Sequence, residues 1–160
     1  MVATYRPNDY EAACAFAVAR LRGRFNSGQE NLLQGRTPVE EQLRIDYVAA
    51  LAEIAACRLL NMCWTGCGRS EGGGPSYDVG GVLQVRSITN PSYGLITRMK
   101  DNPDDVTALV LVEETRMCTL LGAARNAEVR MLGLGRDLES SKPYWTLPQS
   151  KLTPIEAFQW

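Results

Sequence analysis

Apolar and polar residues near the start of the chain recur with the period of an α-helix. Alanine, phenylalanine and valine form one side of residues 9–24, and the other side is mostly polar. Asn8 stands directly before this segment and Glu11 follows three residues later, as a capping box requires. The pattern predicts a first helix over residues 9–24 and a loop over residues 25–36.

A longer helical pattern follows and continues to about residue 62. The Thr-Pro-Val-Glu sequence that begins at Thr37 supplies a capping residue, a proline for the first helical position and a glutamate for a capping box. The middle of the segment is rich in alanine, so another element can approach it closely. Asp46 and Glu53 are seven residues apart, which places them on nearly one face of this helix.

After a glycine-rich loop at residues 65–76, the pattern changes to short runs of β-branched and apolar residues. The third run is the most apolar and is expected to be central, and an Asn-Pro-Asp-Asp turn precedes it. The expected strands are residues 77–88, 93–100, 106–113 and 116–121, followed by a short helix at 123–132, an edge strand at 144–147 and a last helical turn from Thr153.

This order of elements predicts a single domain over residues 1–160 of the mixed α/β (α+β) class. Two helices come first, and three or four strands follow in a largely antiparallel meander, as in α+β folds. A chain of this length can bury roughly 70% of the surface that its unfolded form exposes, so it can fold without disulfides or metals.

Charge and composition narrow the possible functions. The chain has 17 basic and 18 acidic residues, so a nucleic-acid partner would need a local positive surface. It has no histidine, which excludes Ser-His-Asp and Cys-His catalytic groups and histidine-ligated zinc. Because it has neither a long apolar run nor the features of a signal peptide at its start, we expect it to stay in the cytoplasm.

Five cysteines stand at positions 14, 57, 63, 67 and 118. Their odd number and the expected intracellular location indicate reduced thiols. Cys57, Cys63 and Cys67 are near one another in sequence, and Cys118 would complete a four-thiolate metal site. Since there is no CxxC pair, the alternative is favoured, in which they are small apolar side chains of the core.

Residues 78–86, DVGGVLQVR, are the candidate site. Gln84 and Arg86 are two residues apart, so in a strand they project to one face and Val85 to the other. Asp78 precedes a pair of glycines, which often mark a bend or bulge that brings an earlier residue into line. A carboxylate, an amide and a guanidinium are thus expected to converge, with Glu53 on the alanine-rich helix nearby.

These residues resemble the motif of the PD-(D/E)xK nuclease superfamily, in which an acidic residue is followed by acidic-x-Lys on the next strand, with a glutamate on a preceding helix. Asp78, Gln84 and Arg86 match the motif positions, and Glu53 matches the helix glutamate. The resemblance implies a restriction-endonuclease-like αβββαβ core over residues 38–135, with the N-terminal helix as an addition. The runs around residues 78–113 are similar to small nuclease-like proteins of phages and bacteria.

The resemblance implies that Glu53, Asp78 and Gln84 bind Mg²⁺ or Mn²⁺, which would polarise a DNA phosphodiester and activate water. Two departures matter. Gln84 offers a neutral amide oxygen in place of a carboxylate, and Arg86 stays protonated, so it can hold a phosphate but cannot act as a base. Asp101, at the end of the second expected strand, is expected to be a turn residue.

Two functions follow from these residues. The first is a metal-dependent nuclease that cuts DNA. The second, favoured by the missing carboxylate at Gln84, is a catalytically degenerate nuclease-fold module that binds within a larger assembly, such as a virion or a complex in an infected bacterial host.

Overall fold

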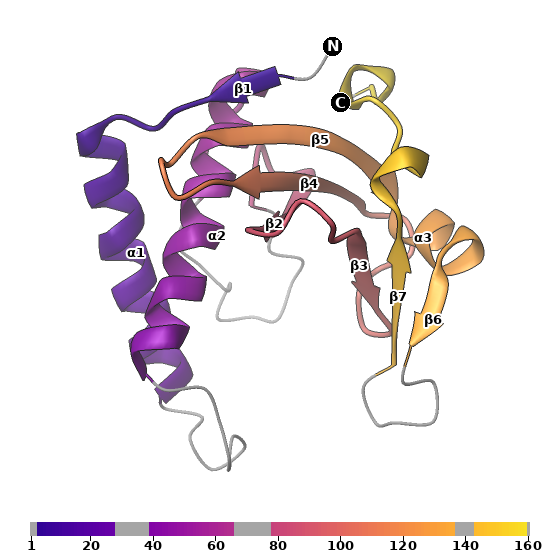
Figure 1. Ribbon diagram of the computed structural model, residues 1–160, viewed down its shortest axis with the longest axis horizontal. Helices are drawn as coiled ribbons and strands as arrows, with labels where there is room; N and C mark the ends of the chain where they lie inside the picture. The colour runs from indigo at the N-terminus through magenta and orange to yellow at the C-terminus, as the bar shows by residue number, and fades with distance from the viewer. Residues whose placement is uncertain (1–2, 28–38, 66–77, 137–142, 160) are drawn as a thin grey trace.

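The computed structural model of the chain describes residues 3–27, 39–65, 78–136 and 143–159. Within these ranges it is a mixed α/β protein, as predicted, with two sheets and three α-helices. Figure 1 shows the two long helices side by side at one end and the smaller sheet with the short helix at the other. The helices are α1 (Asp9–Ser27), α2 (Val39–Leu60) and α3 (Asn126–Leu132).

The first helix begins with the predicted capping box. The Glu11 backbone N–H donates to the Asn8 side-chain oxygen, and the Asn8 N–H donates to the Glu11 carboxylate, both at 2.9 Å. These bonds satisfy two of the amides that a helix start leaves unpaired. The helix continues to Ser27, so residues 25–27 are helical and the loop predicted there is wrong.

The second helix lies between the first helix and the sheet. Its residues from Ala50 to Cys57 are all buried, because this alanine-rich segment has neighbours on more than one side. The helix ends at Leu60, two residues before the predicted end. The capping residues predicted at Thr37 and Pro38 lie outside the described residues.

The larger sheet has four strands in the order β1-β5-β4-β2. β4 is central, as its apolar sequence predicts, and it pairs antiparallel with β5 but parallel with β2. The predicted antiparallel meander is therefore wrong. β5 begins at Cys118, two residues later than predicted, and continues through residues 122–125, of which 123–125 were predicted to be helical. The strands are β1 (Ala3–Tyr5), β2 (Leu83–Ile88), β4 (Val106–Val112) and β5 (Cys118–Arg125).

The chain between β2 and β4 leaves the larger sheet and forms the edge of a second one. This sheet has the order β3-β7-β6, so β7 is its central strand and not the predicted edge strand. Gly94 permits the arrangement, because a Cβ at this position would collide with the Leu147 carbonyl. The strands are β3 (Leu95–Arg98), β6 (Leu134–Arg136) and β7 (Tyr144–Leu147).

Two apolar clusters cover the two faces of the larger sheet. The main core joins α1 and α2 to the face that carries Leu83 and Val85. The second core joins the opposite face, at Ile88 and Leu109, to α3 and the smaller sheet. β2 therefore contributes alternate side chains to both cores. None of the helices in the described ranges combines the length and apolarity needed to cross a membrane.

Candidate functional site

Glu53 lies in the buried middle of α2, where it is 4% exposed. Arg22 of α1 donates one hydrogen bond to each of its carboxylate oxygens, at 2.9 and 2.8 Å. The indole N–H of Trp64 donates to Oε2 at 2.9 Å. A buried charge is tolerated when it has such partners. Glu53 is therefore a carboxylate whose two oxygens both accept hydrogen bonds from protein donors.

Asp78 lies directly before a tight turn that folds back onto the start of β2. Gly80 and Gly81 have φ values of +60° and +73°, which glycine adopts without steric cost. The Asp78 N–H donates to the Leu83 carbonyl at 3.0 Å, and its carboxylate Oδ2 accepts from the Val85 N–H at 2.8 Å. The glycine pair therefore brings Asp78 into line with the strand, as predicted.

Asp78 and Glu53 lie close enough to affect each other electrostatically. Burial raises the pKa of Asp78, and the charge of Glu53 raises it further, to about 6. The Val85 N–H, Arg22 and Arg86 act in the opposite direction. A carboxyl group with this pKa exchanges its proton near neutral pH, which is more common at functional sites than elsewhere.

Side chains alternate between the two faces of β2, so Gln84 and Arg86 do not lie on the face that packs against α2. Val85 is buried in the main core, as predicted, so Gln84 and Arg86 lie on the face turned away from α2. Arg86 donates to the Asp101 carboxylate at 3.2 Å and borders a cavity of about 120 Å³. Gln84 is half-buried and is not among the residues lining that cavity. The structure thus keeps Arg86 within electrostatic range of Asp78 and turns Gln84 away from α2.

Two residues of the site, Arg22 and Trp64, were not predicted. Arg22 continues the buried stripe of α1, four residues after Val18. A charged residue at the end of an apolar helix face indicates a buried partner of opposite charge, so this signal is present in the sequence. Trp64 lies beyond the end of α2 and is bridged to Val79, directly after Asp78. No sequence pattern singles it out.

The carboxylates of the site are candidate ligands for a divalent cation. Among the described residues, no three acidic or cysteine side chains are grouped in a way that would hold a metal ion. Glu53 and Asp78 nevertheless supply the hard oxygen ligands that Mg²⁺ prefers, and this ion commonly uses one or two carboxylates and several waters. The negative charge of Glu53 raises the pKa of Asp78, and a cation beside Asp78 would offset that charge. The residues therefore fit Mg²⁺ in their chemistry.

No protein-family model, curated protein or solved structure matches this chain. Membership of the nuclease superfamily therefore stays a prediction. It depends on residues 78–86 and on the helix glutamate Glu53.

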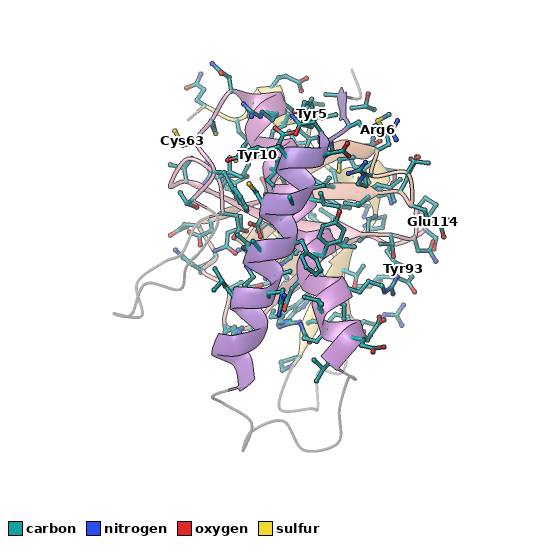
Figure 2. The ribbon with its side chains drawn as sticks, turned by 90° about the vertical axis from the view of Figure 1, so that its left-hand side faces the viewer. Tyr5, Arg6, Tyr10, Cys63, Tyr93 and Glu114 are labelled. Atoms are coloured by element: carbon teal, nitrogen blue, oxygen red, sulfur yellow. The ribbon has the colours of Figure 1, made fainter. Side chains whose placement is uncertain are left out.

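The cysteines that the structure describes do not gather in a group of three or more that could hold a metal ion. Cys57 and Cys118 are buried in the main core, and burial raises the pKa of each thiol to about 12. Cys63 is exposed and lies at the surface in Figure 2, so the core position predicted for it is wrong. Cys67, another thiol of the alternative four-thiolate site, lies outside the described residues. Cys57 and Cys118 thus behave as the predicted core side chains.

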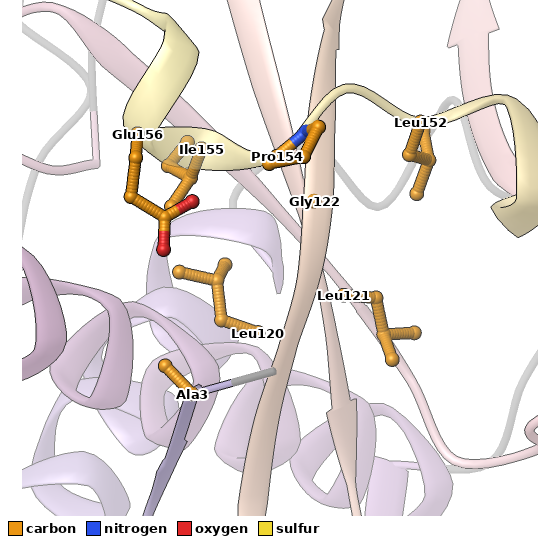
Figure 3. Close-up of a pocket in the computed structure, with 8 residues that line it drawn as sticks. All are labelled: Ala3, Leu120, Leu121, Gly122, Leu152, Pro154, Ile155 and Glu156. Atoms are coloured by element: carbon orange, nitrogen blue, oxygen red, sulfur yellow. The ribbon is translucent and has the colours of Figure 1, made fainter. Parts of the chain in front are cut away.

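A second cavity, also of about 120 Å³, lies at the opposite edge of the larger sheet from β2. Figure 3 shows it between β5 and the C-terminal segment, with Leu120 and Ile155 on its walls. Glu156 is the one charged residue in its lining. Because it lies at the far edge of the sheet from β2, it has no part in the candidate site.

Proposed function

We propose that this chain is a metal-dependent nuclease, or nuclease-like hydrolase, that acts on the phosphodiester bonds of DNA. The supporting observation is that burial, together with the charge of the nearby Glu53, raises the pKa of Asp78 to about 6. Two carboxylates that share a buried site favour the uptake of a proton or a cation. The observation therefore favours a cation site at the position that the nuclease motif indicates.

Each residue then has a distinct role. Glu53 and Asp78 would hold Mg²⁺ or Mn²⁺, which when bound supplies positive charge to the phosphate and lowers the pKa of a coordinated water. The hydrogen bond from the Val85 N–H orients the Asp78 carboxylate. Arg86 is a permanent cation that can hold a phosphate oxygen, and Asp101 positions its guanidinium. Gln84 is a neutral donor and acceptor on the same strand face as Arg86.

The test is cleavage of single-stranded and duplex DNA with Mg²⁺, compared with an EDTA control, together with calorimetric titration of Mg²⁺. We expect Asp78→Asn to reduce cleavage by roughly a hundredfold or more and to weaken Mg²⁺ binding, because it removes a charged ligand. Asp104→Asn is the matched control, since Asp104 is exposed in a turn. Cleavage by Asp78→Asn at the wild-type rate would remove Asp78 from the mechanism.

One observation favours the second candidate function, a binding module without catalysis. Both oxygens of Glu53 already accept hydrogen bonds, from Arg22 and Trp64, as in a structural ion pair. Under this alternative the wild-type protein neither binds Mg²⁺ nor cleaves DNA, while Arg22 and Glu53 serve only the packing of α1 on α2. The same titration and cleavage assays decide between the two functions.

A further inference from the structure

The cavity beside Arg86 lies where the free edges of the two sheets meet. β2 is an outer strand of the larger sheet and β3 an outer strand of the smaller one. One wall consists of Arg86, Ser87 and Ile88 from β2, and the other contains Ile96 and Arg98 from β3. The cavity is therefore lined by two arginines together with mainly apolar residues.

The lining carries more positive than negative charge. Ile96 and Arg98 lie on the exposed face of β3, since Leu95 and Thr97 are buried. Among the described residues, no hydrogen bond or ion pair engages the Arg98 guanidinium, and Arg86 has the single carboxylate partner Asp101.

Lys100, two residues after Arg98, is also exposed. Its position extends the positive charge along the turn that follows β3. A chain with a formal net charge of −1 thus has a local cationic surface at this point.

The turn that presents Arg98 is held in place by several hydrogen bonds. The Asp101 carboxylate accepts from the Arg98 N–H at 2.8 Å. Arg130 of α3 donates to the carbonyls of Arg98, at 2.8 Å, of Met99, at 3.1 Å, and of Asp101. The Arg130 guanidinium in turn lies over the Trp145 ring, 5.8 Å from its centre. The cationic turn is therefore fixed before any ligand arrives, which lowers the entropic cost of binding.

We propose that this cavity binds a backbone phosphate of a nucleic-acid strand, with Arg98 and Arg86 as its ligands and Ile96 against the adjoining sugar. The planar fork of arginine matches phosphate oxygens in geometry, and apolar side chains suit the deoxyribose. The inference rests on the proposed function, since the bound strand would continue from Arg98 past Arg86 to the bond beside Asp78. Arg98 thereby becomes a substrate-binding residue outside the nuclease-like motif.

The experiment measures binding of a fluorescein-labelled DNA oligonucleotide, single-stranded and duplex, by anisotropy over a range of salt concentrations in EDTA, so that no cleavage occurs. We expect Arg98→Ala to weaken binding roughly tenfold and to reduce the slope of log K against log salt by about one. Arg98→Lys keeps the charge and should recover part of the affinity.

Arg20→Ala is the matched control, because Arg20 is an exposed arginine on α1, away from the cavity. It should bind DNA as the wild type does, and circular dichroism should show that all variants are folded. The inference is overturned if the wild type does not bind DNA, if Arg98→Ala binds as tightly as the wild type, or if the Arg20 and Arg98 variants weaken equally.

Hydrolysis of bis(p-nitrophenyl) phosphate by the wild type with Mg²⁺ tests catalysis separately, because this small diester does not need the cavity. Hydrolysis without Arg98-dependent DNA binding removes the cavity from the mechanism and leaves the proposed function. Arg98-dependent binding without hydrolysis supports the cavity as a nucleic-acid site and overturns the catalytic proposal alone.

Discussion

Arg22 of α1 and Glu53 of α2 form an ion pair with two parallel hydrogen bonds, and their side chains are 24% and 5% exposed. The pair connects the N-terminal helix to the candidate site. A buried pair of this kind is costly to break from one side, since the remaining charge stays in the core without its main partner. Arg22 thus supplies the positive charge next to Glu53 that a bound cation would otherwise supply.

We expect Arg22→Ala to lower the free energy of unfolding by about 3–5 kcal/mol, because it leaves the buried Glu53 carboxylate without its main partner. Arg44→Ala is the control. It removes an exposed ion pair with Glu41, and such pairs contribute about 1 kcal/mol or less. Urea denaturation of both variants measures the difference, and equal losses would show that the Arg22–Glu53 pair is effectively solvated.

The same variant tests whether the site accepts a cation. With Arg22 absent, Mg²⁺ has access to Glu53 and Asp78 and should recover part of the lost stability, because a ligand that binds the folded state alone stabilises it. Mg²⁺ should stabilise the wild type less, since Arg22 already donates hydrogen bonds to both oxygens of Glu53. Thermal melts with and without Mg²⁺, at ionic strength matched with NaCl, measure both effects. An equal response of the two proteins would contradict the proposed cation site.

The raised pKa of Asp78 predicts how stability depends on pH. The folded protein holds the Asp78 proton up to about pH 6, whereas an unfolded chain releases it near pH 4. The free energy of unfolding therefore decreases as the pH rises through this interval, by roughly 2–3 kcal/mol from this group. Asp78→Asn stays neutral, so it should be more stable than the wild type at about pH 7.5 and similar at about pH 4.

Urea titrations at the two pH values measure this prediction as the difference between the two proteins. Other shifted groups, such as Asp46 and Glu11, are present in both and cancel in the comparison. A constant difference between wild type and variant at both pH values would show that Asp78 titrates normally.

Local signals in the sequence predict most of the elements. The capping box of Asn8 and Glu11 works within one helical turn, so the sequence alone defines the start of α1. The position of Asp78 is similarly local, since the φ values of Gly80 and Gly81 decide how the chain turns back. The apolar run of β4 predicts a central strand because both of its faces are buried.

Strand pairing is not local, and the sequence predicted it poorly. Residues 93–100 were expected beside their neighbours in sequence, yet β3 pairs with β7, about fifty residues later in the chain. The close approach of Gly94 to the Leu147 carbonyl allows this pairing. The residues around Gly94 in sequence do not indicate that its partner is Leu147. Because β3 lies in the smaller sheet, β2 pairs directly with β4, and the two strands run parallel.

The candidate site was predicted in part, for the same reason. Asp78 lies within electrostatic range of Glu53, and the alanine-rich segment of α2 packs on β2, which allows this approach. Arg22 belongs to a helix outside the nuclease-like motif, so the motif could not predict it. The partnership of Arg22 with Glu53 depends on the packing of α1 on α2.

Thiol reactivity distinguishes the core cysteines from those available to a metal. Burial raises the pKa of Cys57 and Cys118 to about 12, so neither forms the reactive thiolate at neutral pH. We expect iodoacetamide to label the exposed Cys63 in the native protein and to label Cys57 and Cys118 only after unfolding, as measured by peptide mass spectrometry. Zinc-dependent protection of all three residues would instead support a thiolate metal site.

Asn126, the first residue of α3, connects the two sheets through its buried side chain. It is 1% exposed, and its Oδ1 accepts hydrogen bonds from Thr97 of β3 at 2.7 Å and Thr107 of β4 at 2.9 Å. Its Nδ2 donates to the Asn102 carbonyl at 2.8 Å, in the turn before β4. This one amide therefore holds β3, and with it Arg98, against the larger sheet.

We expect Asn126→Ala to lower the free energy of unfolding by about 2–4 kcal/mol, because two buried hydroxyls and a carbonyl lose their partner. The control is the triple variant Asn126→Leu, Thr97→Val and Thr107→Val, which removes the hydroxyls together with the amide. It should lose less stability than Asn126→Ala, since apolar groups of similar shape leave fewer buried polar groups unpaired. Hydrogen exchange provides the local measurement: in Asn126→Ala the amides of Leu95–Arg98 should exchange faster, while those in the centre of β4 change less. Uniform acceleration across both sheets would show that Asn126 supports the whole fold and not the attachment of β3.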